Sequence, residues 1–208
     1  MRRGDVPKDA LHAQHLLRIH AAGNAQLQQQ LRELYGTIRA ERNPQREAVI
    51  RQVREHLAAR AGDPLRGVEV FRRLCAPCHR IYGEGNDVGP DLTRNGRASL
   101  AQLLSNVLDP NLVIGEAYQT RIVVTVDGRV ITGLLVEETP QRVVLKVQGG
   151  TLESIARRDV DDMQVSPISL MPEGLEKQLS LEELADLFAF LRLDKPPTDP
   201  TARPIPDE

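Results

Sequence analysis

The chain has 208 residues, 40% of them apolar and 27% charged, and a formal net charge of −2 at pH 7. This length suits one ordinary domain with an appendage, or two small domains. The charge balance gives no support for a nucleic-acid-binding protein, and no apolar run reaches the roughly 18 residues expected of a membrane span. The charges are uneven, however: residues 1–62 hold 11 basic and 6 acidic side chains, and the remainder holds 16 and 23.

Residues 1–62 are predicted to be a helical segment. Apolar side chains in residues 24–40 recur at the spacing of one helix face; they are Leu27, Leu31, Leu34, Tyr35 and Ile38. A second helix is expected to begin with Asn43 as its N-cap and Pro44 as its first residue. We interpret the two helices as a hairpin, and as the last helical repeat of a longer protein.

A third helix, capped by Asp63, leads into Cys75-Ala76-Pro77-Cys78-His79, which is the c-type haem attachment signature. The two thiols can add to the vinyl groups of one haem, and the adjacent imidazole then ligates the iron. A structural zinc site needs four ligands, but the chain has no other cysteine and no histidine after residue 79. A redox CxxC pair would open a helix rather than follow one. The sequence therefore predicts one covalent haem c on Cys75 and Cys78, with His79 as the proximal iron ligand.

Beyond an irregular Gly-rich stretch over residues 81–92, a helix is predicted over residues 99–108. The hydrophobic period then changes from helical spacing to alternation, with turns at Asp127-Gly128 and Gly149-Gly150. The predicted strands cover residues 118–126, 129–136, 142–147, 151–155 and 160–165. We expect a five-stranded antiparallel meander that curls into a small SH3-like or Sm-like barrel. Its edge strands invite pairing with another chain, so a homodimer is predicted.

The last helix is expected to begin at Ser180, because Ser180 and Glu183 form a capping box. Residues 194–208 hold five prolines and read as a tail or linker without a packed core.

The distal iron ligand is predicted to be Met171. After residue 62 the only methionines are Met163 and Met171. Met163 lies in a predicted strand, where a sulfur usually fills the core. Met171 lies in an irregular loop about nine residues before the last helix. A thioether ligand raises the reduction potential, which suits an electron carrier.

The surroundings of the haem motif resemble class I cytochrome c. Gly67 and Phe71 look like the N-terminal helix of that class, and Phe190 resembles the aromatic on its C-terminal partner helix. Gly89-Pro90 is similar to the segment whose proline carbonyl accepts a hydrogen bond from the proximal imidazole. The resemblance implies a mainly α protein: a class I cytochrome c fold with an inserted small antiparallel β-unit and an N-terminal helical hairpin.

More specifically, residues 63–193 resemble the haem-binding domain at the C-terminus of large exported proteins of planctomycetes and verrucomicrobia. The matching motifs are Cys75-x-x-Cys78-His79, Gly83-x-Gly85, Gly89-Pro90-Asp91-Leu92, Leu108-Asp109-Pro110-Asn111, Tyr118, Asp127-Gly128, Thr132-Gly133 and Ser169-Leu170-Met171-Pro172-x-Gly174-Leu175. In that family the domain often follows a β-propeller and helical repeats, and the parent proteins are assigned a dehydrogenase role. The resemblance also implies the domain limits: a helical segment 1–62, a cytochrome c domain 63–193 with a β-insert 118–166, and a Pro-rich tail 194–208.

The leading functional hypothesis is an electron-transfer module, not itself an enzyme, that serves a redox partner protein or domain. The alternative is a haem site with a labile sixth ligand that binds small molecules or performs peroxide chemistry. A third hypothesis, an adaptor working through the β-insert or the tail, leaves the haem motif unused. Covalent haem attachment takes place outside the bacterial cytoplasmic membrane, so a periplasmic or otherwise exported protein is expected. Because a polar stretch follows Met1-Arg2-Arg3 where a signal peptide would be apolar, we expect the chain to be a piece of a longer exported protein.

Overall fold

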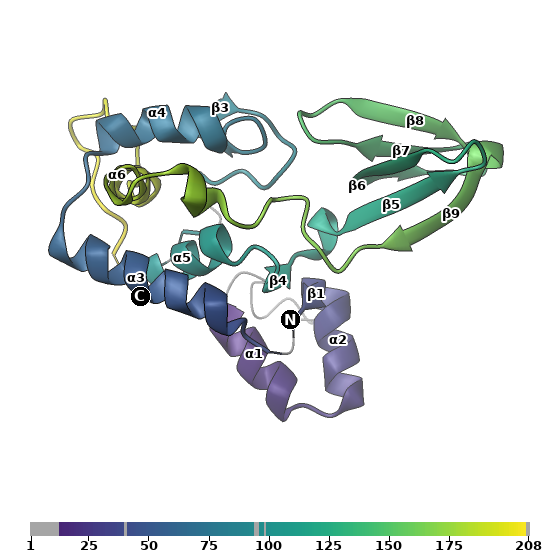
Figure 1. The fold of residues 1–208 in the computed structure, drawn as a ribbon, viewed down its shortest axis with the longest axis horizontal. Helices are drawn as coiled ribbons and strands as arrows, with labels where there is room; N and C mark the ends of the chain where they lie inside the picture. Colours follow the sequence, from purple (N-terminus) through teal and green to yellow (C-terminus); the bar gives the residue numbers. More distant parts are fainter. Residues whose placement is uncertain (1–12, 40, 94–95, 98, 207–208) are drawn as a thin grey trace.

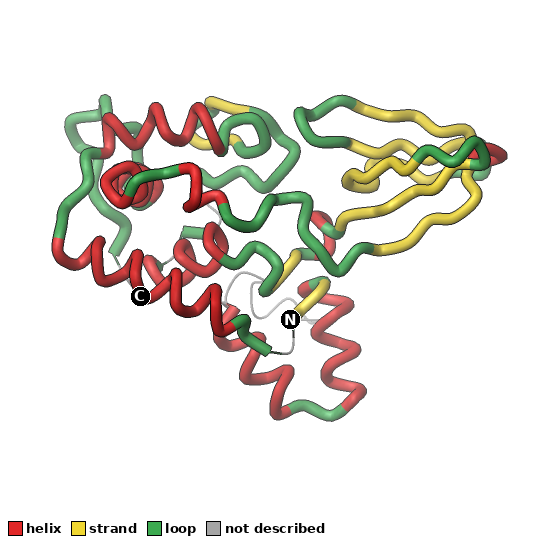
Figure 2. Tube along the Cα trace, viewed as in Figure 1, coloured by secondary structure: helices red, strands yellow, loops and turns green. Residues whose placement is uncertain are grey.

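The computed structural model describes residues 13–206 except 40, 94–95 and 98. Its helices gather on one side of the molecule, and a five-stranded antiparallel sheet projects from the other (Figures 1 and 2). In the structure, 40% of the residues are helical and 22% lie in strands, which is a mixed α/β fold. The predicted mainly α class I cytochrome c fold is therefore wrong. The sheet is not a minor addition, because it buries an apolar core of its own.

Four helices form the main core: α3 (Pro44–Ala59), α4 (Pro64–Leu74), α5 (Leu100–Leu108) and α6 (Leu181–Leu191). The fully buried side chains at its centre are Phe71, Leu104, Leu108, Leu187, Phe188 and Leu191. Helix α3 contributes Ile50 and Val53 to the same core. The segments on either side of residue 62, which the sequence suggested to be separate, thus pack together.

Each of these four helices begins where the sequence predicted. The side chain of the residue before the helix accepts hydrogen bonds from the first free N–H groups, which have no partner within the helix. The capping residues are Asn43, Asp63, Ser99 and Ser180. Every helix in the described part of the chain is too short or too polar to cross a membrane.

Helices α4 and α6 cross closely at Gly67. A Cβ atom at this position would lie 2.1 Å from the backbone oxygen of Asp186, so only glycine fits there. The rings of Phe71 and Phe190 pack beside the crossing, with centroids 5.5 Å apart. Asp186 also accepts hydrogen bonds from the backbone N–H of Asp63 (2.6 Å) and from Nε of Arg66 (2.8 Å). The crossing therefore fixes the start of α4 against the middle of α6.

The N-terminal part differs from its prediction. Helix α1 (Ala13–Ala22) was not predicted, and α2 (Ala25–Tyr35) ends before Ile38. Ile38 lies instead in β1 (Thr37–Ile38), which pairs antiparallel with β4 (Val113–Ile114). This pairing joins the segment that follows α2 to the chain that follows α5. The predicted hairpin of α2 with α3 is not seen among the described residues: α2 contacts α1 instead. The basic start at residues 1–3, and the rest of residues 1–12, lie outside the described residues.

The sheet contains the five predicted strands: β5 (Thr120–Thr125), β6 (Val130–Glu138), β7 (Arg142–Lys146), β8 (Leu152–Ala156) and β9 (Val160–Val165). Their spatial order is β8-β7-β6-β5-β9, and all neighbours are antiparallel. Four strands form the expected meander. The fifth, β9, returns to pair with β5 instead of continuing beside β8, so the simple five-stranded meander is wrong.

The short link between β8 and β9 requires the sheet to curl. These strands lie at opposite edges, yet only the 3₁₀ turn η3 (Arg157–Asp159) joins them. Four Cα steps span at most about 14 Å, whereas the edges of a flat five-stranded sheet lie about 19 Å apart. The curl expected for a small barrel is thus present, although β8 and β9 do not pair to close it.

The C-terminal tail is more ordered than expected. Leu193 and Pro204 form an isolated antiparallel bridge. The N–H of Asp194 donates to the carbonyl of Arg203 at 2.9 Å, and the N–H of Ile205 donates to the carbonyl of Arg192 at 2.7 Å. The proline-rich segment therefore turns back onto the end of α6 rather than extending as a linker.

Candidate haem-binding site

The two cysteines and the histidine of the attachment motif lie on one turn at the end of α4. The N–H of Cys75 donates to Phe71 as the last bond of the helix (2.8 Å). The N–H groups of Cys78 and His79 both donate to the carbonyl of Cys75, at 3.0 and 2.8 Å. The thiols and the imidazole are thereby carried on a single compact turn, which is what attachment and ligation of one haem require.

The His79 ring is held in the tautomer that a metal ligand needs. Its Nδ1 atom lies 2.9 Å from the carbonyl oxygen of Pro90. A carbonyl oxygen only accepts hydrogen bonds, so Nδ1 carries the proton and Nε2 keeps a lone pair. Burial lowers the pKa of His79, against a smaller opposite effect of the Pro90 hydrogen bond. The imidazole is therefore neutral at pH 7, and its hydrogen bond to Pro90 fixes the ring orientation and raises its basicity as a ligand.

Gly89 forms a close-fitting wall for this ring. A Cβ atom at position 89 would lie 2.4 Å from Cε1 and 2.8 Å from Nδ1 of His79. The N–H of Gly89 donates to the carbonyl of Cys78 at 2.7 Å, which fixes the wall to the motif. The Gly89-Pro90 segment thus supports the imidazole by both shape and hydrogen bonding, as the resemblance had implied for Pro90.

The loop after the motif folds back onto it. β2 (Arg80–Ile81) and β3 (Glu84–Gly85) form a two-stranded hairpin, and Asn86 donates from its backbone to Ala76 (3.0 Å) and from its side chain to Pro77 (3.3 Å). These bonds make the motif and the following loop one rigid unit.

Cys75 does not have the character of a redox-active thiol. Burial, with a smaller effect from Cys78, raises the pKa of Cys75 to about 12. A thiol that stays protonated at neutral pH is a poor nucleophile, unlike the low-pKa cysteine of thioredoxin-like motifs. A bare metal ion is not favoured either, because the described residues contain no cluster of three His, Cys, Asp or Glu side chains. The covalent haem expected from the sequence stays a prediction.

The two methionines after residue 62 occupy different environments. Met163 lies in β9 and packs against the core of the sheet, as predicted for a core-filling residue. Met171 lies half-buried in the connection between β9 and α6, outside the three apolar cores. The structure brings Cys75, Cys78, His79 and Pro90 together. No hydrogen bond among the described residues joins Met171 to these four, and its place opposite His79 stays a prediction.

Sequence reasoning missed a buried arginine behind the haem-motif loop. Arg97 is 4% exposed, and its guanidinium donates to the backbone oxygens of Leu191 (2.9 Å) and Leu193 (2.5 Å) and to the hydroxyl of Tyr82 (3.0 Å). It therefore ties the loop to the end of α6. An isolated arginine in an irregular segment has no periodicity that would reveal its burial.

The sheet also reaches the haem-motif loop. Nζ of Lys146, at the end of β7, donates to the backbone oxygen of Asp87 at 3.2 Å and lies 3.4 Å from its carboxylate. A Cβ atom at Gly150 would contact the Val88 side chain at an ordinary 3.6 Å. The predicted β-insert therefore contacts the segment that carries Gly89 and Pro90.

No family model matches this chain, and no curated protein matches it.

Proposed function

We propose that this chain is a c-type haem protein that transfers single electrons, with the haem attached through Cys75 and Cys78 and its iron ligated by His79 and Met171. The observation that carries the proposal is the hydrogen bond from Nδ1 of His79 to the carbonyl oxygen of Pro90. His79 lies on the same turn as both thiols. With the proton on Nδ1, Nε2 of the neutral ring keeps a lone pair that can bind iron. The two cysteines precede this histidine at the spacing of the haem attachment motif. When bound, haem c supplies a one-electron couple whose potential depends on its axial ligands and surroundings.

The role of the protein in this proposal is to hold the ligands still. Pro90 fixes the ring orientation, Gly89 supports its face, and the folded-back loop stabilises the attachment turn. A proximal ligand that does not move between oxidation states favours electron transfer over chemistry at the iron. Met171 lies outside the three apolar cores, and the proposal assigns its sulfur as the sixth ligand.

We also propose that the chain belongs to the haem-binding domains of large exported planctomycete and verrucomicrobial proteins, on the motifs given above. In this setting the domain is periplasmic or otherwise exported and exchanges electrons with a dehydrogenase-like parent or a separate redox partner. This assignment rests on the motifs and on the geometry around His79.

The proposal is tested by export of the chain in a bacterium with periplasmic haem-attachment machinery. The expected product carries one haem that survives denaturation, and a variant with both Cys75→Ser and Cys78→Ser carries none. Its ferric spectrum is expected to be six-coordinate and low-spin, and its ferrous form to resist carbon monoxide. A haem that comes off on denaturation contradicts the attachment. Rapid carbon monoxide binding by the wild type favours instead the ligand-binding or peroxidase-like alternative.

A further inference from the structure

The loop that carries Met171 is held by a side chain from outside it. The N–H of Ser169 donates to Oδ1 of Asn111 at 2.9 Å, and Nδ2 of Asn111 donates to Oε2 of Glu173 at 3.0 Å. Ser169 and Glu173 stand two residues before and two residues after Met171. One amide group, placed just beyond α5, therefore binds the loop on both sides of the proposed distal ligand.

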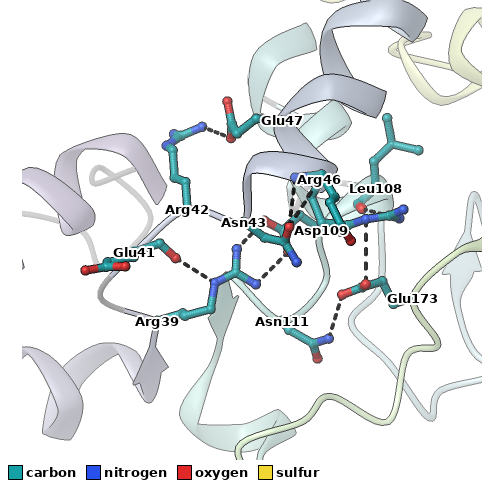
Figure 3. Close-up of polar contacts among 11 residues, drawn as sticks. Arg39, Glu41, Arg42, Asn43, Arg46, Glu47, Leu108, Asp109, Asn111 and Glu173 are labelled. Carbon is teal, nitrogen blue, oxygen red and sulfur yellow. Dashed lines mark hydrogen bonds and ion pairs between the residues drawn. The ribbon is translucent and has the colours of Figure 1, made fainter.

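A buried arginine supports this arrangement from the opposite side. Arg46, in the first turn of α3, is 6% exposed, and its Nη1 donates to the carboxylate of Glu176 (3.0 Å) and to the backbone oxygen of Leu108 (3.2 Å). Its Nε lies 3.6 Å from Glu173. Figure 3 shows Arg46 and Asn111 both directed at Glu173. The Glu173 carboxylate is thus held by the Arg46 guanidinium and the Asn111 amide together.

The support extends back into the N-terminal segment. Arg39 makes a two-pronged contact with Asp109, through Nη1 at 3.0 Å and Nη2 at 2.6 Å, and the Asp109 side chain is fully buried (Figure 3). The backbone N–H of Arg39 donates to the carbonyl of Leu112 at 3.0 Å. The stretch from Leu108 to Leu112 that presents Asn111 is therefore fixed by residues that precede the haem domain predicted from the sequence.

We infer that Asn111, backed by Arg46, positions Met171 as the distal ligand of the haem. The inference rests on the proposed function, because it needs a haem whose sixth ligand is Met171. Neither side chain touches the iron in this scheme; both act by restricting the loop. Hydrogen bonds with a charged partner stabilise a structure more than hydrogen bonds between neutral groups do. Loss of one such bond shifts a two-state loop equilibrium by about tenfold or more.

The test uses the intact haem-loaded chain and two paired substitutions. Asn111→Ala removes both loop contacts. Its control is Asn106→Ala in α5, which removes one 3.3 Å hydrogen bond to the backbone oxygen of Gly96. Arg46→Met removes the buried cation; its control, Arg42→Met, breaks the ion pair with Glu47. The readouts are the weak sulfur-to-iron absorption band of the ferric form, the rate of carbon monoxide binding to the ferrous form, and the reduction potential. Far-UV circular dichroism reports the fold independently.

We expect Asn111→Ala and Arg46→Met to weaken the sulfur-to-iron band, speed carbon monoxide binding about tenfold or more and lower the potential, while both controls behave as the wild type. Where either variant fails to fold, Glu173→Gln is used instead, because it removes only the charge of a partly exposed side chain. It is expected to weaken the band, speed carbon monoxide binding and lower the potential as well. Folded variants with an unchanged band and unchanged carbon monoxide binding overturn the inference but leave the proposed function standing. A wild type without the band overturns both the His79/Met171 pair and the inference.

Discussion

Gly89 lies against the imidazole of His79 so closely that a methyl group there would stand 2.4 Å from Cε1 of the ring. The ring cannot retreat without losing its 2.9 Å hydrogen bond to Pro90. The sequence Gly89-Pro90 thus sets both the position and the protonation of the proposed proximal ligand. Position 89 must therefore lack a side chain, and position 90 must present its carbonyl oxygen to the His79 ring.

Gly89→Ala is therefore expected to displace the His79 ring and break its bond to Pro90. The haem-loaded variant should show a mixed-spin ferric spectrum and a lower haem content than the wild type. Gly83→Ala is a suitable comparison for the spectrum, because a Cβ atom at position 83 meets nothing within 4 Å, although its φ of 83° strains the turn. Visible absorption after purification measures the effect. A low-spin spectrum in Gly89→Ala would contradict the role of Gly89 in holding the His79 ring.

Met171→Ala is expected to abolish the sulfur-to-iron absorption band and to open the iron to carbon monoxide. The physical reason is that the domain after residue 62 offers no second histidine, and Met163 is packed into the sheet. Met163→Leu, a swap of similar volume, is the matched control and should keep the band. Persistence of the band in Met171→Ala would show that another ligand is used.

Gly67→Ala is expected to lower the free energy of unfolding by about 1–3 kcal/mol or more, because the new methyl group meets backbone atoms that cannot move aside. The nearest of these, the Asp186 oxygen, would lie 2.1 Å away. Gly115→Ala is the control, since its Cβ would have an ordinary 3.6 Å contact with Tyr118 and its φ is −57°. Urea unfolding of both variants and the wild type measures the difference; equal losses would mean that the α4–α6 crossing tolerates the extra atom.

The pH dependence of stability should carry a contribution from Asp186. Burial works to raise the pKa of Asp186, but hydrogen bonds from Arg66 and from the backbone of Asp63, with nearby positive charge, hold that pKa below its ordinary value. The unfolded chain then binds a proton at a higher pH than the native state does. The stabilisation is present above the unfolded pKa of about 3.9 and is lost as the pH falls through the native value.

Asp186→Asn removes this titration while keeping an acceptor for the Asp63 N–H. The variant should be less stable than the wild type at pH 7, and the gap should narrow as the pH falls below about 4. Other carboxyl groups with lowered pKa values, such as Asp127 and Glu137, titrate in both proteins and cancel in the comparison. Urea unfolding at several pH values measures the gap; a constant gap would exclude the linkage.

Local signals predicted local structure well. Asn43, Asp63 and Ser180 each begin a helix because their side chains satisfy N–H groups within a few residues. Partners distant in the chain left no such signal, so the pairing of β9 with β5 and the burial of Arg46 and Arg97 were missed. The mainly α class was taken from the resemblance, although the five predicted strands already indicated a substantial sheet. Asn111 appeared in a quoted motif, but only the structure shows its contacts with Ser169 and Glu173.

The role of the sheet can be tested by replacing it with a short linker. The N–H of Ser166 donates to the carbonyl of Thr120 at 2.9 Å, so the chain enters and leaves the sheet at neighbouring points. Edge strands β8 and β9 present unpaired backbone groups, and exposed apolar side chains lie on or beside them, including Leu152 (55% exposed) and Val165 (48%). Such edges favour pairing with a second chain.

We therefore expect the intact chain to form a homodimer, and a version with residues 121–165 replaced by a short glycine-rich linker to be monomeric. Light scattering on both proteins measures the mass directly. A milder variant, Val165→Lys, places a charge beside the β9 edge and should weaken the dimer without removing the sheet. The linker version also loses the Lys146–Asp87 contact with the haem-motif loop, so its haem spectrum must be recorded alongside. An intact chain that is monomeric at high concentration would leave the sheet with its contact to the Asp87–Val88 loop as its remaining role, and would exclude the dimer.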